Sequence, residues 1–417
     1  MTRRAPHPVV YLFLVLPFGV MGGYVTVSLG YLLSKAGVPV PAIAALVAAS
    51  YIPHTWKFAW APLVDTTLSR RTWYLLSSVV SAAGILLTGL LPIRAASIPM
   101  LTMVVVISNV AVTFLGMATN SLMAYATPED QKGRAGGWFQ AGNLGGTGLG
   151  GGAGLWMAQN LPAPWIAGAV LAGACLLCAI PVFFMHEAHS PHREGGLLKS
   201  LRNVGSDLWN VTTSRAGFLA LFLCFLPIGS GAASNLWAAV AGDWHASAAA
   251  VGMVNGLLSG GLSAVGCIAG GWVCDRMDRK TSYIAYGALQ AACAVAMALA
   301  PRTETTYVVF VSLYAFITGL TYAGFTAVVL EAIGMGAAAT KYNVYASLSN
   351  FPIYYMTLLD GKAHSLWGPG GMLNTEATVG VLGLALFVGV VAILRALRPR
   401  GAPIPVEVRL PEDEPRT

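Results

Sequence analysis

The sequence predicts an all-α membrane protein, with twelve transmembrane helices arranged as two pseudo-symmetric six-helix bundles. Three observations lead to this fold class. The first is composition: of the 417 residues, 56% are hydrophobic and only 10% are charged, whereas soluble domains carry about 25% charged residues. The second is a series of long apolar stretches along the whole chain. The third is a set of polar landmarks that recur in the two halves.

The apolar stretches are long enough to be membrane-spanning helices, which need roughly 20 residues to cross the hydrocarbon core of a bilayer. They do not alternate between apolar and polar residues with a period of two, so they do not fit the strands of a membrane barrel. The expected spans lie near residues 9–34, 40–64, 72–93, 98–126, 134–158, 161–185, 215–241, 247–273, 280–300, 304–333, 338–362 and 376–397.

Lysine and arginine residues predict the orientation, because the cytoplasmic loops of membrane proteins are enriched in them. If the N-terminus is cytoplasmic, only Lys35, Arg94, Arg302 and Lys362 fall outside, and Lys57 lies within a span. All other lysines and arginines then lie on the cytoplasmic side. We therefore expect both termini in the cytoplasm. The membrane is expected to be a bacterial inner membrane. The net charge of +7 is explained by this bias, so no nucleic-acid partner is expected.

The longest polar connection divides the spans into six and six. The expected parts are a first bundle (1–185), a cytoplasmic linker (186–214), a second bundle (215–400) and a cytoplasmic tail (401–417). The linker holds three histidines without cysteine or acidic ligands in a fixed frame, so a solvated linker is favoured over a metal site. The six cysteines lie in or at the ends of apolar spans and are expected to be inert. We expect no metal and no other cofactor.

Polar landmarks recur in the two halves at a nearly constant offset. Asp65 and Asp275, at the ends of the second and eighth spans, are 210 positions apart (275 − 65). Asn143 and Asn350, in the fifth and eleventh spans, are 207 apart (350 − 143). Two halves with the same landmarks are typical of secondary transporters built from repeats. Enzymes and receptors have no general need for such symmetry.

The chain resembles the major facilitator superfamily, whose signature G-x-x-x-D-R-x-G-R-K/R lies between spans two and three. The second half matches it with Gly271, Asp275, Arg276, Arg279 and Lys280, and has Asp278 in place of the family glycine. The first-half copy carries Ala61, Thr66 and, one residue late, Arg70 and Arg71. The segments KFAWAPLVD, PEDQKGRAGGWFQAGNLGGTGLGGG and KYNVYASLSNFPIYYMTLLDG are similar to the AmpG-related branch. This branch includes muropeptide permeases, acetyl-CoA transporters and some siderophore importers.

Charged residues in the cytoplasmic loops are candidates for a gate. A carboxylate at the end of one helix and arginines in the following loop can form charge-assisted hydrogen bonds. Such a latch would hold adjacent helices together in the outward-open state. The alternative is that these loops only follow the positive-inside rule and that each Asp merely ends a helix. The candidate gating residues are Asp65, Arg70, Arg71, Arg134, Asp275, Arg276, Arg279, Lys280 and Lys341.

Polar side chains form stripes along three apolar spans. They are Gln140, Asn143 and Thr147 on the fifth span, Asn343, Ser347, Asn350 and Tyr354 on the eleventh, and Tyr314, Thr318, Tyr322 and Thr326 on the tenth. Because polar side chains are costly against lipid, such stripes are expected to face an aqueous cavity or the bundle interior. They predict a roomy cavity for a polar solute with sugar or amide groups. Bonding between neighbouring helices is the alternative.

Lys57 is the one basic residue inside an expected span, and an intramembrane charge is a functional candidate by default. It could attract an anionic substrate or pair with an acid. It could also reach the cytoplasmic surface along its stem. His54, Trp56 and Trp60 could line the same wall, although Trp at a membrane interface is common without any ligand. The candidate substrate-binding residues are Lys57, Trp60, Gln140, Asn143, Thr147, Asn235, Tyr314, Tyr322, Ser347, Asn350 and Tyr354.

Proton coupling requires a group in the transport pathway that gains and loses a proton. Glu331 closes the tenth span and Asp360 closes the eleventh, so both carboxyl groups are candidates. Lys57 is a third candidate if burial favours its uncharged form. Related permeases tend to carry an aspartate near the end of the fourth span, where this chain has Tyr125.

A glycine-rich run, NLGGTGLGGGAG, contains the spacing Gly146-x-Gly148-x-x-Gly151 of a dinucleotide-binding loop. No strand precedes it, so the structural context of such a loop is missing. Gly142, Gly146 and Gly150 instead follow the four-residue spacing that lets membrane helices approach closely. The family resemblance places the fifth span beside its counterpart across the cavity, where we expect these glycines to act.

The sequence therefore predicts a transporter rather than an enzyme. We expect a monomeric secondary importer, driven by protons, that moves a medium-sized polar solute by rocker-switch alternating access. The branch resemblance implies a muropeptide-like amino sugar, or alternatively a siderophore or a coenzyme-A thioester. A drug exporter of the same fold is a further alternative. A membrane-bound transferase would need a catalytic group of residues in a loop at the membrane face, and the sequence contains none.

Overall fold

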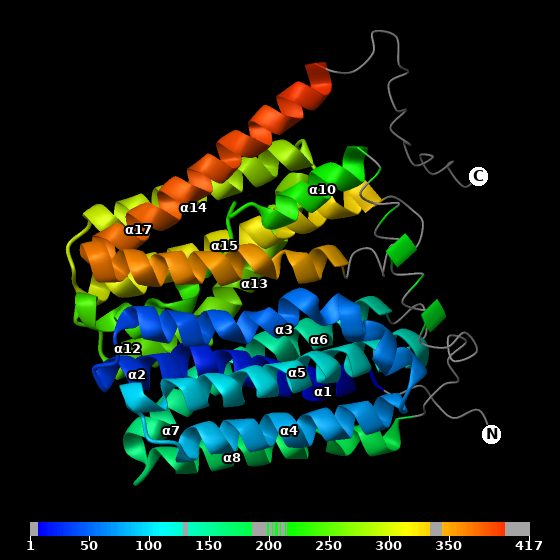
Figure 1. Cartoon of the computed structure of the whole chain (residues 1–417), viewed down its shortest axis with the longest axis vertical. Coiled ribbons are helices and arrows are strands. Elements are labelled where there is room, and N and C mark those ends of the chain that lie inside the picture. The colour runs from blue at the N-terminus through cyan, green and yellow to red at the C-terminus, as the bar shows by residue number, and fades with distance from the viewer. Residues whose placement is uncertain are drawn as a thin grey trace, which may run out of the picture.

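The computed structural model describes residues 7–127, 132–185, 215–333 and 344–396, with a few positions between 198 and 213. All regular secondary structure in these residues is helical, and the long helices run side by side (Figure 1). Within the described part of the chain, eight segments are long and apolar enough to cross a membrane. One of them, residues 344–393, contains two transmembrane helices. Three further helical segments, residues 40–66, 132–160 and 215–244, complete the twelve.

The first half (residues 7–185) begins with α1 (Val10–Gly23), η1 (Tyr24–Leu29) and α2 (Gly30–Lys35), which together make one span. The next three spans are α3 (Val40–Thr66), α4 (Arg70–Leu90) and η2 with α5 (Ala95–Ser97 and Ile98–Ala126). The fifth consists of α6 (Lys132–Gly148), η4 (Leu149–Ala153) and α7 (Gly154–Asn160), and the sixth of α8 (Pro164–Leu177) and η5 (Ile180–Phe184). Helix α1 packs against α6, and α4 packs against α5 and α8.

The second half (residues 215–396) begins with an irregular span of α10 (Arg215–Phe225), η7 (Ala232–Asn235), α11 (Trp237–Val240) and η8 (Ala241–Trp244). The eighth span consists of α12 (Ala248–Val251), η9 (Gly252–Leu258) and α13 (Ser259–Cys274). Helices α14 (Arg279–Leu299), α15 (Glu304–Ile333) and α17 (Asn350–Ala396) follow. Helix α13 packs against α15, and α14 packs against α15 and α17. Helix α17 also packs against α3 of the first half.

Helix α17 is a helical hairpin that supplies both the eleventh and the twelfth span. Its two arms meet at Gly368, whose φ of 67° is left-handed and is readily adopted only by glycine. Pro369 then begins the second arm, where its fixed φ suits a first helical turn. Figure 1 shows the two arms of α17 running back in opposite directions. The twelfth span therefore begins close to residue 369, and the expected start at residue 376 is wrong.

The seventh span is broken in its middle, where the sequence predicted a continuous helix over residues 215–241. Helix α10 ends at Phe225, just before Pro227, which has no backbone N–H to continue the helix. Gly229 and Gly231 then adopt left-handed φ values of 59° and 69°. The chain resumes in the short turn η7. Interrupted helices of this kind often build the binding sites of transporters.

The glycine run of the fifth span packs directly on α1. A Cβ atom added to Gly142, Gly146 or Gly150 would lie only 2.0–2.3 Å from a carbonyl oxygen of α1. Gly19 and Gly23 of α1 approach the fifth span just as closely. The predicted role in close helix approach is confirmed. The predicted partner was wrong, because these three glycines contact α1 of their own half.

The two halves contact each other at the end of the bundle away from the start of α1. Ser34 donates a hydrogen bond to the carbonyl of Ala239 across the halves. A Cβ added to Gly361 would lie 2.3 Å from the Cβ of Ala44, and one added to Gly256 would lie 2.5 Å from the backbone nitrogen of Gly152. The π-helical turns η1, η4 and η9 also contact one another there. These contacts close one end of the interface between the halves.

Candidate functional site

A cavity of about 440 Å³ lies between the two halves. The first half contributes residues from α1, α3, α5 and the fifth span, and the second half contributes residues from the seventh, eighth, tenth and eleventh spans. The volume falls within the range of 300 to 1,000 Å³ that is usual for small-molecule sites. The position between two six-helix halves matches that of substrate sites in transporters built from repeats.

The cavity wall is rich in amide and hydroxyl groups. Five asparagines line it: Asn109, Asn143, Asn235, Asn255 and Asn350. Hydroxyl groups come from both halves, from Thr26, Ser50, Tyr51, Thr147, Ser234, Ser259, Ser263, Thr318 and Tyr322. Such groups can donate and accept hydrogen bonds in many directions. The wall therefore suits a solute with several hydroxyl, amide or carbonyl groups.

Lys57 supplies a positive charge to this wall. It is the one lysine or arginine among the described residues that line the cavity, and none of these residues is Asp or Glu. Within the described residues Lys57 has no salt-bridge partner. One turn earlier on α3, His54 Nε2 lies 3.1 Å from Asn109 Oδ1. An amide-rich wall with one lysine, and no carboxylate among the described lining residues, can form favourable contacts with a negatively charged group.

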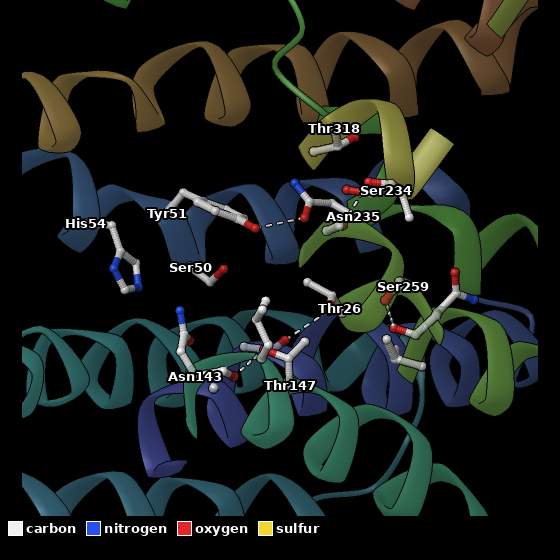
Figure 2. A pocket seen from close by; sticks show the side chains of 18 of the residues that line it. Thr26, Ser50, Tyr51, His54, Asn143, Thr147, Ser234, Asn235, Ser259 and Thr318 are labelled. Atoms are coloured by element: carbon white, nitrogen blue, oxygen red, sulfur yellow. Dashed lines mark hydrogen bonds between the residues drawn. The ribbon is translucent and has the colours of Figure 1, made fainter. Parts of the chain in front are cut away.

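A chain of hydrogen bonds connects the cavity to the second half. Tyr51 of α3 donates to Oδ1 of Asn235 in η7 over 2.8 Å, and Figure 2 shows these side chains pointing toward each other. Asn235 Nδ2 in turn donates to Thr357 Oγ1 over 3.0 Å. Thr357 lies on the first arm of α17. Three spans from both halves are thus joined through one asparagine.

Of the eleven residues predicted to bind substrate, six line the cavity. They are Lys57, Asn143, Thr147, Asn235, Tyr322 and Asn350. Asn143 and Asn350 occupy corresponding positions in the two halves, so the repeat brings the same amide to both walls. Figure 2 shows Asn143 and Thr147 on the side of the first half.

The other five predicted residues lie elsewhere. Trp60 Nε1 donates to Thr113 Oγ1 over 3.1 Å, and Gln140 is exposed on α6. Tyr314 is buried and donates to Glu376. Ser347 is fully buried, and Tyr354 packs against the ring of Phe351. Tyr314 joins α15 to α17, which is the alternative that was left open for the polar stripes.

Several lining residues were not among the predicted ones. Tyr51 and Asn109 come from α3 and α5, and Asn255 comes from the π-helical turn η9. His54, which was expected beside Lys57 as a possible wall residue, does line the cavity. Tyr51 lies three residues before His54, so the same helical spacing could have predicted it. Asn109 in the fourth span and Asn255 in the eighth belong to no helical stripe of polar residues. The sequence therefore did not predict that they face the cavity.

The candidate gating residues lie at the helix ends near the start of α1, as far as the structure describes them. Arg70 is almost fully buried and its Nε donates to Ser121 of α5 over 2.7 Å. Arg71 donates to the carbonyl of Met185 over 2.6 Å. These bonds tie the start of α4 to two neighbouring spans.

In the second half, Asp275 is the exposed cap residue at the end of α13. Arg276, in the turn that follows, stacks on Trp272 of α13 with 3.8 Å to the ring centroid. Arg279 and Lys280 begin α14. The side chains of Asp65 and Arg134, and the whole of Lys341, lie outside the described residues. The latch therefore stays a prediction in both halves.

The coupling candidates lie in different surroundings. Asp360 is fully buried inside the second half. Glu331 belongs to α15, but its side chain lies outside the described residues. Lys57 faces the cavity. Within the described residues, no cluster of three or more possible metal ligands occurs.

Residues 9–353 match the model of the Major Facilitator Superfamily. The chain belongs to this superfamily. It is therefore a multi-pass membrane transporter and not an enzyme. No curated protein matches the chain at a significant level.

Solved structures of transporters share the fold over nearly the whole chain. A D-xylose–proton symporter superimposes with a TM-score of 0.69 at 13% identity, covering 91% of this chain and 96% of its own. The nucleoside transporter NupG gives 0.66 at 13% identity, covering 93% and 98%. The xylose transporter XylE from E. coli, in a partially occluded inward-open conformation, gives 0.66 at 15% identity, covering 92% and 98%.

Proposed function

We propose that this superfamily member is a proton-driven importer of a medium-sized, negatively charged polar solute, of the kind found in muropeptide-like amino sugars. It works by rocker-switch alternating access in the bacterial inner membrane, with both termini in the cytoplasm. Protons are proposed as the driving ion partly because one similar structure is a D-xylose–proton symporter. The AmpG-like sequence segments support the amino-sugar assignment.

The substrate class is proposed from the composition of the cavity wall. Five asparagines and one lysine line it, and no carboxylate is present among the described lining residues. Acetamido and peptide groups can pair with the asparagine amides, whereas a lactyl or peptide carboxylate can pair with Lys57. A neutral sugar would leave this cation without a partner.

Contacts between the halves support alternating access. The halves meet at the end of the bundle away from the start of α1, through glycines and the Ser34 hydrogen bond. With cytoplasmic termini, this would be the outward-facing end. Rocking would open it and close the opposite end, where Arg70, Arg71 and Asp275 lie. We propose that these charged residues hold the cytoplasmic end closed.

The test is uptake by the purified full-length protein in proteoliposomes with an imposed pH gradient. A radiolabelled N-acetylmuramoyl peptide is expected to accumulate when the side that supplies it is acidic, and dissipation of the gradient with a protonophore should abolish this accumulation. N-acetylglucosamine, a siderophore and acetyl-CoA serve as comparison solutes. Accumulation of a siderophore or of acetyl-CoA in place of the muramoyl peptide would favour those alternative importers. Outward movement of hydrophobic dyes against their gradient would favour the drug exporter.

A further inference from the structure

Two carboxyl groups are buried next to each other inside the second half. Asp360 has 0% and Glu376 has 6% of its surface exposed. The two groups lie within electrostatic range of each other. The same contact is close enough for a hydrogen bond if one of the two groups is protonated. Apart from it, both oxygens of Asp360 and Oε2 of Glu376 have no hydrogen-bond partner among the described residues. Glu376 was not predicted as a coupling residue.

The hairpin of α17 brings these acids together. Asp360 lies eight residues before Gly368 (368 − 360) and Glu376 lies eight residues after it (376 − 368). Because the two arms run in opposite directions, positions at equal distance from the turn lie at the same level. The sequence of the hairpin therefore places one carboxyl group opposite the other.

The surroundings of the pair are polar but hold no cation. Tyr314 of α15 donates to Glu376 Oε1 over 2.7 Å, and the hydroxyl of Tyr355 also lies within electrostatic range of Glu376. Behind Tyr314, Gln290 of α14 donates to Thr318 over 3.2 Å. Within the described residues, no lysine, arginine or histidine interacts with either acid.

Such a pair cannot stay doubly ionised. A buried ionised carboxylate without a cation is costly, and two carboxylates that share a site repel each other, so at least one of them holds a proton. Tyr314 can stabilise an ionised Glu376 by its hydrogen bond, whereas Asp360 has no such donor. The site is therefore built to hold one or two protons.

The turn η7 connects this pair to the cavity. Ala233 lies in η7, and its backbone interacts with the Glu376 carboxyl. Two residues later, Asn235 lines the cavity and donates to Thr357, which lies one turn before Asp360. The left-handed glycines Gly229 and Gly231 precede η7. One short turn thus contacts the acids on one side and the substrate space on the other.

We propose that Asp360 and Glu376 form the proton-binding site for transport, and that η7 transmits their protonation state to the cavity. This inference rests on the proposed proton coupling. A proton from the outer compartment neutralises the pair and favours substrate binding through Asn235. Release of this proton to the inner compartment leaves one buried negative charge on the pair, which displaces η7 and weakens substrate binding. Linkage requires that substrate in turn promotes proton binding.

The experiment compares the wild-type protein with Asp360→Asn and Glu376→Gln in proteoliposomes. Each substitution mimics a protonated carboxyl without changing its shape. Accumulation of the radiolabelled N-acetylmuramoyl peptide under a pH gradient is expected to fall about tenfold or more, whereas counterflow exchange without a gradient stays within about twofold. Glu304→Gln is the matched control, because Glu304 is an exposed acid at the start of α15 whose contact with the Ser247 backbone a glutamine can keep.

The outcomes separate the two proposals. If the wild-type protein exchanges solute but never responds to a pH gradient, the proposed proton coupling fails, and this inference fails with it. If the wild-type protein is coupled and either acid variant accumulates solute normally, the assignment of the pair alone is overturned. Loss of counterflow in a folded variant would also contradict it, because a neutral pair should still bind and exchange.

If the variants fail to fold, a measurement on the wild-type protein alone still tests the proposal. Infrared difference spectra of the wild-type protein, recorded between about pH 5 and pH 9, are expected to show a protonated carboxyl band that decreases as the pH rises. Addition of the unlabelled N-acetylmuramoyl peptide should shift the decrease to higher pH. A band that is absent, or that responds to neither pH nor peptide, would show that the acids play no part in proton binding.

Discussion

The hydroxyl of Tyr51 donates a 2.8 Å hydrogen bond to Oδ1 of Asn235, and this bond joins α3 of the first half to the turn η7 of the second. Both side chains line the cavity. The bond can exist only while the two halves are close at this level. It therefore stabilises the arrangement in which the end of the bundle away from the start of α1 is closed.

Replacement of Tyr51 by Phe should shift the balance between the two arrangements of the halves. A neutral hydrogen bond contributes about 1 kcal/mol net, which corresponds to a change of about fivefold in the equilibrium constant. Spin labels at the exposed positions Ala36 and Arg302 should report a larger population of long distances. Tyr31→Phe is the control, because Tyr31 makes no hydrogen bond within the described residues. Identical distance distributions for Tyr51→Phe and wild type would contradict the role of this bond.

Replacement of Lys57 by Gln should weaken binding of negatively charged solutes selectively. Hydrogen bonds to charged groups contribute about 1.5–3 kcal/mol, so KM for the N-acetylmuramoyl peptide should rise by about tenfold or more. Transport of a neutral analogue, in which the carboxylates are amidated, should change little. Lys35→Gln is the control, since Lys35 is exposed and donates to Gln159 over 3.1 Å. An equal loss for both solutes would assign Lys57 a structural role.

Two neighbouring glycines of α6 should respond differently to the same substitution. A Cβ at Gly146 would lie 2.3 Å from the carbonyl oxygen of Leu16, whereas a Cβ at Gly145 meets no atom within 4 Å. Gly146→Ala should therefore destabilise the protein by about 1–3 kcal/mol through forced separation of α1 and α6. Gly145→Ala should be neutral or stabilising, because alanine has the higher helix propensity. Thermal unfolding in detergent measures both, and equal Tm values would refute the packing argument.

Asp275→Asn should slow transport while substrate affinity is largely kept, if Asp275 acts as a latch at the end of α13. A lost charge-assisted contact of about 1.5–3 kcal/mol predicts a decrease in turnover of about tenfold. The control is Asp278→Asn in the same loop, because Asp278 accepts from the backbone of Thr281 as a helix cap and asparagine caps equally well. An unchanged turnover in Asp275→Asn would remove the latch role.

Sequence patterns predicted the membrane fold, the span count and part of the cavity wall. Apolar length identifies a span, and the repeat offset paired Asn143 with Asn350, which the structure places on the same cavity. A helical stripe, however, shows only that side chains share a face. It does not show which neighbour covers that face. Thr318 faces the cavity, whereas Tyr314, one turn earlier on the same stripe, reaches away from it to Glu376.

The acid pair was hidden by a wrong helix boundary. The expected spans left residues 363–375 as a loop, with the twelfth span beginning at residue 376. Glu376 was therefore expected at the end of a helix, next to water. A single left-handed glycine makes the turn instead, and Glu376 lies two turns inside the helix. Hydropathy alone cannot locate such a tight turn. The break in the seventh span was missed for a similar reason, since the apolar character continues through Pro227 and both left-handed glycines.

The close approach of η9 to η4 takes place between backbone atoms, with Gly256 lying against Gly152. Glycine has no rotamers to immobilise, whereas ordering a long side chain costs up to about 2 kcal/mol. The halves can therefore separate and meet again at this point without ordering any side chain. The polar contacts of Ser34 and Tyr51 are then expected to set the frequency of switching, and the glycine surfaces to keep its entropic cost low.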